Sequence, residues 1–189
     1  MNFLGKFFSG NKPKKSKYLP EKREPIEISF VKKFTLNGGK FLYCENEAEL
    51  RISFQNILIE NEISTSELIS NENSIIDYFK IDNDVLNPKA LVVNCEFLIS
   101  DQGSIMVSNQ QILDKKINQL PEILIIMAKT SDFKNDVSEA MSAIKNKYGK
   151  SIPSNITNIH ATNPKKNSNF ISYKRTSKEL DLLLSDVNK

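Results

Sequence analysis

A polar corner between two apolar runs holds the residues best suited to chemistry. Residues 95–109 read CEFLISDQGSIMVSN, with apolar runs at 97–99 and 105–107 on either side of Asp101-Gln102-Gly103-Ser104. Apolar runs around an Asp-x-Gly-Ser turn predict two adjacent strands joined by a tight loop, in which glycine takes a positive φ. The corner would then lie at the mouth of a buried sheet.

Two polar turns are expected to reach one crevice, because ligands of open parallel sheets lie beyond the carboxyl ends of strands. At the corner, Gly103 would let backbone N–H groups approach an anion, Ser104 would donate a hydroxyl, and Asp101 would orient a substrate hydroxyl or act as a base. The second turn contains Lys129 and Thr130, directly after an unbroken apolar run at 123–128. In the alternative interpretation, Asp101 only caps its own backbone and the corner is a simple turn.

Several classes of chemistry are excluded by the residue inventory. The chain has two cysteines, Cys44 and Cys95, both inside apolar runs, and one histidine, His160, which follows an alternating run and is not expected to be a catalyst. We therefore expect no metal site, no cofactor, and reduced buried thiols in a cytoplasmic protein. The sequence contains no G-x-G-x-x-G, Walker or G-x-S-x-G motif, so neither a nucleotide cofactor of the usual kind nor a hydrolase elbow is expected.

The positive charge is concentrated at the N-terminus. The 189 residues carry a net charge of +3, yet residues 1–25 hold seven Lys/Arg against two Glu, so the remainder is nearly neutral. We expect a basic leader at 1–24 and one domain at 25–189, no nucleic-acid binding, and no membrane span, because no apolar run approaches about 20 residues. Three roles of the leader stay open: a weak membrane contact, a docking peptide for a partner protein, or a mobile leader.

Periodicity and turn residues predict alternating strands and helices. Helical spacing of apolar residues, with Asn46 as an N-cap and Gly149 as a stop, separates the helices from the short β-rich runs. Strands separated by helical stretches imply βαβ units and a mostly parallel sheet. Helices are expected at 25–36, 46–60, 73–79, 112–120 and 136–148, strands at 40–44, 67–70, 90–94, 96–100, 104–108, 123–128 and 156–160, a loop at 161–168, and a strand or a helix at 180–184.

The corner resembles that of a known family. Residues 101–106, DQGSIM, are similar to the Asp-Thr-Gly-Ser/Thr corner of the LUD-domain family, lactate utilization protein C type. The resemblance continues through Leu120-Pro121, the run at 123–127, the turn at 128–130 and the helix at 136–148, and it covers the chain from about residue 26 to the C-terminus. One segment departs: many members carry Gly-Pro-Ser-Arg-Thr-Ala-Asp-Ile-Glu, whereas residues 172–180 read SYKRTSKEL and keep only Arg175 and Thr176.

The resemblance implies a fold and a function. The family is placed with the ribose-5-phosphate isomerase and CoA-transferase-like folds, which implies a strand at 180–184 and an α/β fold. We therefore expect a single three-layer domain with a mostly parallel sheet flanked by helices, plus an antiparallel strand pair around residues 96–108. The expected ligand-binding residues are Asp101, Gly103, Ser104, Lys129, Thr130, Arg175 and Thr176, with a small anionic metabolite as ligand.

The family resemblance also implies a role beside iron–sulfur partner proteins. The chain would be a non-metal subunit or accessory factor in the oxidation of L-lactate to pyruvate. Two alternatives stay open. The first is a stand-alone binding protein or enzyme for a phosphorylated or CoA-linked metabolite. The second is a degenerate structural protein, which the altered segment at 172–180 favours.

Overall fold

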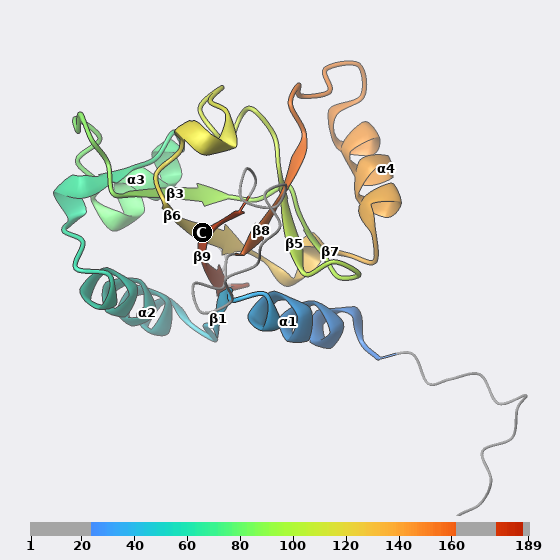
Figure 1. Ribbon diagram of the computed structural model, residues 1–189, viewed down its shortest axis with the longest axis horizontal. Helices are drawn as coiled ribbons and strands as arrows, with labels where there is room; N and C mark the ends of the chain where they lie inside the picture. Colours follow the sequence, from blue (N-terminus) through green and yellow to red (C-terminus); the bar gives the residue numbers. More distant parts are fainter. Residues whose placement is uncertain (1–23, 162–176, 187–189) are drawn as a thin grey trace, which may run out of the picture.

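The fold is an α/β arrangement built on strands from all parts of the chain. The computed structural model describes residues 24–161 and 177–186 (Figure 1). The elements are α1 (Ile26–Leu36), β1 (Lys40–Tyr43), α2 (Glu47–Glu60), η2 (Thr65–Glu67), β2 (Leu68–Ile69), α3 (Asn73–Phe79), β3 (Ala90–Asn94), β4 (Phe97–Ile99), β5 (Ser104–Val107), η3 (Ile117–Gln119), β6 (Ile123–Ala128), η4 (Thr130–Asp132), β7 (Phe133–Lys134), α4 (Val137–Tyr148), β8 (Thr157–Ala161) and β9 (Ser177–Leu184).

The strands form one mostly parallel sheet, which confirms the predicted fold class. Among the described residues it has nine strands in the order β2-β3-β6-β9-β8-β5-β4-β7, with β1 also pairing with β9. The β2–β3, β3–β6, β6–β9, β1–β9, β8–β9 and β4–β7 pairs are parallel. The β4–β5 and β5–β8 pairs are antiparallel, so the predicted pair around residues 96–108 is present.

One face of the parallel strands is covered by α2 and α3. Side chains alternate along a strand, so Val92 of β3 and Ile125 of β6 point toward these helices. The two helices meet through stacked rings of Phe54 and Phe79, with centroids 3.8 Å apart. Figure 1 shows α2 and α3 on one side of the molecule and α4 on the other.

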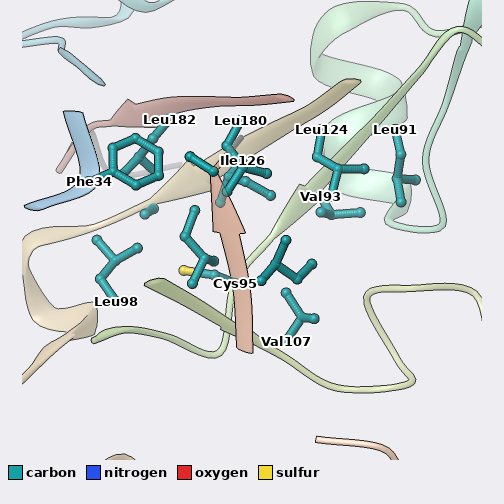
Figure 2. Close-up of a cluster of buried hydrophobic side chains, with 14 of the residues drawn as sticks. Phe34, Leu91, Val93, Cys95, Leu98, Val107, Leu124, Ile126, Leu180 and Leu182 are labelled. Atoms are coloured by element: carbon teal, nitrogen blue, oxygen red, sulfur yellow. The ribbon is translucent and has the colours of Figure 1, made fainter. Parts of the chain in front are cut away.

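The opposite face of the parallel strands shares a core with the β4–β5 hairpin. Leu91 and Val93 of β3 belong to the same buried cluster as Leu98 and Val107 of the hairpin (Figure 2). Helix α1 adds Phe30 and Phe34 to this cluster, and the outer face of the hairpin packs on α4. The sheet is therefore curled, with the hairpin lying between the parallel strands and α4.

Side-chain caps define the helix starts that the sequence predicts. Asn46 Oδ1 accepts a hydrogen bond from Glu49 N at 2.9 Å at the start of α2. Asp136 Oδ1 accepts one from Glu139 N at 2.9 Å at the start of α4, which ends at Gly149. Both helices thus satisfy otherwise unpaired amides in their first turns.

The helix predicted at 112–120 is wrong. Leu113 and Asp114 have φ of 57° and 55°, and only the short 3₁₀ helix η3 forms before Pro121. Asn109 explains the turn: its side-chain amide donates to the Asp114 carboxylate at 2.9 Å, and its carbonyl accepts from Asp114 N at 3.1 Å. Such local polar bonds compete with helical ones. The apolar residues Ile112, Ile117 and Leu120 are nevertheless buried.

The described part of the chain contains no helix with the length and apolar character needed to span a membrane. Within the same residues, no three His, Cys, Asp or Glu side chains cluster in a way that could hold a metal ion.

Candidate functional site

The Asp101–Ser104 corner packs against helix α1. Gly103 has a φ of +60°, as predicted, and a Cβ at this position would lie 2.5 Å from Phe34 N. The Lys33 ammonium donates to the Asp101 carbonyl at 2.9 Å. Glycine is therefore needed here for a close approach between the hairpin and the end of α1.

The donors expected to face an anion have partners inside the protein. The Asp101 amide donates to Asn135 O and the Gly103 amide to Ile99 O, both at 2.9 Å. Ser104 is fully buried, with its hydroxyl 3.4 Å from Gln102 Oε1. The corner residues are not among those that line the cavity described next, and ligand binding by the corner stays a prediction.

A cavity of about 850 Å³ lies at the carboxyl edge of the parallel strands. It is walled by the ends of β3, β6 and β9, by the first turns of α2, and by α3. This is where open parallel sheets hold their ligands. The lining residues are Glu47, Leu50, Arg51, Ser74, Asp77, Tyr78, Lys80, Asn94, Cys95, Met127, Ala128, Lys129, Asp132 and Ser185.

Two lysines supply positive charge to the cavity. Lys129 follows β6, as predicted, and Lys80 ends α3 with a φ of 54°. Neither ammonium group lies within ion-pair distance of a carboxylate in residues 24–161 and 177–186. Both are exposed and available to an anionic ligand.

Thr130 forms hydrogen bonds within the protein that connect two parts of the fold. Its hydroxyl donates to the Asp186 carboxylate at 2.7 Å and its amide at 2.8 Å, and these bonds hold the pKa of Asp186 below its usual range. The contact ties the turn after β6 to the residues after β9. Arg175 and Thr176, the remaining predicted site residues, lie outside the described residues.

Arg51 and Tyr78 form a flat wall of the cavity. The Arg51 guanidinium carbon lies 4.1 Å from the centre of the Tyr78 ring. One guanidinium nitrogen donates to Glu47 at 3.0 Å and another to the Tyr78 carbonyl at 3.2 Å. The guanidinium is therefore held at three points, and 49% of the Arg51 side chain remains exposed.

Asp132 is a half-buried carboxylate in the cavity lining. Burial raises the pKa of Asp132, although its hydrogen bond from Lys129 N at 2.8 Å opposes this effect. Burial also raises the pKa of the neighbouring Cys95 thiol well above its usual range, so Cys95 stays a neutral thiol. A carboxyl group with a raised pKa in a cavity is a candidate for proton exchange with a ligand.

Sequence reasoning identified only Lys129 among the cavity residues. Asp132 lies three residues beyond it in the same turn, so the rule that ligands sit at strand carboxyl ends could have found it. The same rule applied to β3 would have pointed to Asn94 and Cys95. Arg51 and Tyr78 carry no such signal, because they come from helices far apart in the sequence.

Comparisons with known proteins agree with this fold. A family model described as the LUD domain matches residues 28–181. The crystal structure of a DUF162 family protein from Deinococcus radiodurans is similar, with a TM-score of 0.59 and 16% identity over 85% of this chain and 96% of that chain. At this identity the likeness shows the fold alone. The curated proteins include no match to the chain.

Proposed function

The chain belongs to the LUD domain family, which is associated in general with lactate utilization, and on this basis we propose that it binds an anionic small metabolite in the carboxyl-edge cavity. We further propose that it acts as a non-metal subunit or accessory factor in the oxidation of L-lactate to pyruvate, beside iron–sulfur partner proteins.

One observation carries the binding part of this proposal. The cavity at the carboxyl edge of β3, β6 and β9 is lined by Lys80 and Lys129, and neither ammonium group is paired with a described carboxylate. An unpaired ammonium at a cavity wall attracts a carboxylate or a phosphate. The N-terminus of α2 also faces the cavity, but its first turn contains two acidic residues, Glu47 and Glu49. Because these carboxylates are negatively charged, this helix end does not attract an anion.

The cysteine inventory supports the subunit role. An iron–sulfur cluster is typically held by four cysteine thiolates. This chain has two cysteines, and both are buried free thiols. Electrons would therefore be carried by the partner proteins and not by this chain.

Ligand binding is tested by calorimetry on the full chain with L-lactate, pyruvate and sugar phosphates. We expect at least one of these anions to bind, and Lys129→Gln to weaken it about tenfold, since a hydrogen bond to a charged group contributes roughly 1.5–3 kcal/mol. Lys116→Gln is the matched control, because Lys116 is exposed and lies outside the cavity lining. Equal weakening by both variants, or no binding of any anion, contradicts the proposed site.

The partner role needs a separate test. We expect a tagged chain to co-purify with iron–sulfur proteins encoded beside its gene, and deletion of the gene to abolish growth on L-lactate. Normal growth on lactate after deletion, together with no co-purification, would refute the subunit role while leaving the binding site intact.

The size of the cavity favours a second candidate function. A volume of about 850 Å³ lies in the upper part of the range for drug-sized ligands, whereas lactate has only six non-hydrogen atoms. A stand-alone binding protein or enzyme for a phosphorylated or CoA-linked metabolite would use this space. Thermal stabilisation by sugar phosphates or acyl-CoA, but not by lactate, would favour this second function.

A further inference from the structure

We propose that the cavity binds a nucleotide, with the planar base stacked on Arg51 and the phosphate at Lys129. The inference deepens the proposed binding function and rests on it. The lysines account only for binding of the charged part of the ligand. The inference names the uncharged part, which is the base.

The Arg51 guanidinium is built as a fixed flat surface. It lies on the Tyr78 ring at 4.1 Å and is held in place by Glu47 and by the Tyr78 carbonyl. The Tyr78 ring is itself supported from the core, because it meets Phe79 edge-on with centroids 4.7 Å apart. A guanidinium with one face on an aromatic ring can offer its other face to a planar group.

The surroundings of Arg51 argue against a role as the anion-binding group. Two of its nitrogens already donate to protein oxygens, and Glu47 neutralises its charge at 3.0 Å. Arg51 is therefore expected to contribute the flat face of its guanidinium to ligand binding, and not its charge. Leu50 and Met127 line the same cavity and add apolar surface suited to an uncharged ring.

The phosphate would lie at a different wall of the cavity. Lys129 comes from the turn after β6, whereas Arg51 and Tyr78 come from α2 and α3. A base at the helices and a phosphate at the strand end would use the length of a cavity of about 850 Å³. This arrangement needs no glycine-rich loop, because an ammonium group replaces the backbone donors that such a loop supplies.

The test compares ligands that differ only in the base. Calorimetry on the full chain would measure binding of AMP and of ribose 5-phosphate, with coenzyme A as a third arm to show whether the nucleotide is free or part of a larger carrier. We expect AMP to bind about tenfold more tightly than ribose 5-phosphate, because a tenfold preference lies within the range that stacking of one base contributes.

Two variants separate the base from the phosphate. Arg51→Lys keeps the charge but loses the planar surface, so it should remove the tenfold preference for AMP and leave ribose 5-phosphate within about twofold of its original affinity. Lys129→Gln should weaken both ligands equally. Tyr78→Leu removes the supporting ring and should act like Arg51→Lys, and melting temperatures establish that each variant is folded.

The outcomes distinguish this inference from the proposed function. If AMP and ribose 5-phosphate bind equally and Lys129→Gln weakens both, the anion site stands and the stacking proposal is overturned. If the preference for AMP survives in both Arg51→Lys and Tyr78→Leu, the base lies elsewhere and the proposal is likewise overturned. Absence of AMP binding overturns it directly.

Discussion

Replacing the buried carboxylate Asp181 by Asn should change how the stability of the protein depends on pH. Asp181 lies in the middle of β9, between Lys40 of β1 and Ile125 of β6, and its side chain is 3% exposed. Its Oδ1 accepts no hydrogen bond from the described residues, and the nearest cation, Lys40 Nζ, is 3.8 Å away. Burial therefore raises the pKa of Asp181 from 3.8 to about 6.

The sign and size of the effect follow from proton binding. Between pH 3.8 and about 6 the folded protein keeps a proton on Asp181 that the unfolded chain has released. The contribution of Asp181 to the free energy of unfolding is therefore fully present below pH 3.8. It is lost as the pH rises to about 6, where the folded protein also releases the proton. Each pH unit in this window costs about 1.4 kcal/mol, so the unfolding free energy falls by roughly 3 kcal/mol.

The assay is urea unfolding of the wild type and of Asp181→Asn at pH values from 3 to 7.5. The neutral amide cannot ionise, so the stability of the variant relative to the wild type should rise by roughly 3 kcal/mol across this range. Asp84→Asn, at an exposed position, is the matched control for removal of a carboxylate. A difference between Asp181→Asn and the wild type that does not change with pH would refute the reasoning.

Four further stability changes are expected from denaturant unfolding. Gly103→Ala should cost about 4 kcal/mol and Gly149→Ala about 2 kcal/mol, because both positions have a positive φ but only the Cβ at Gly103 also meets other atoms; equal losses would contradict the packing role of the corner. Glu96→Gln should cost about 2–3 kcal/mol, because it removes a fully buried carboxylate that Lys147 pairs with at 2.9 Å, and a loss below 0.5 kcal/mol would be inconsistent with that pairing. Asn46→Ala should cost about 1 kcal/mol by removing the cap of α2, and an unchanged midpoint would show that the cap contributes nothing.

The strands and helices could be predicted where one physical signal dominates. The run at Ile123–Ala128 is apolar throughout because β6 lies between two parallel neighbours and is covered on both faces. Helix α3 was predicted with its observed bounds, Asn73–Phe79, and its inward residues Ile75 and Phe79 are buried. Alternation, helical spacing and caps are local, so a single sequence reveals them.

The candidate site could not be predicted in the same way. The cavity brings together Arg51, Tyr78, Lys129 and Ser185, which belong to separate elements, and only the sheet order makes them neighbours. The sequence predicts a site at the corner because the corner follows a strand. That strand, β4, ends in an antiparallel hairpin, whereas the parallel strand β3 ends a few residues earlier, at Asn94. The strand-end rule therefore depends on pairing directions that periodicity does not contain.

The position of β9 has a consequence for how the protein is made. This strand is the last in the described chain, yet it pairs with β6 and β8 and aligns Lys40 of β1 with Asp181. The 48 residues between the end of β6 at Ala128 and the start of β9 at Ser177 take a ribosome that adds 5–20 residues per second roughly 2–10 seconds to synthesise. During that interval the nascent chain presents the apolar edge of β6 without its neighbour, so chaperone contact during translation should depend on how fast the C-terminal segment emerges.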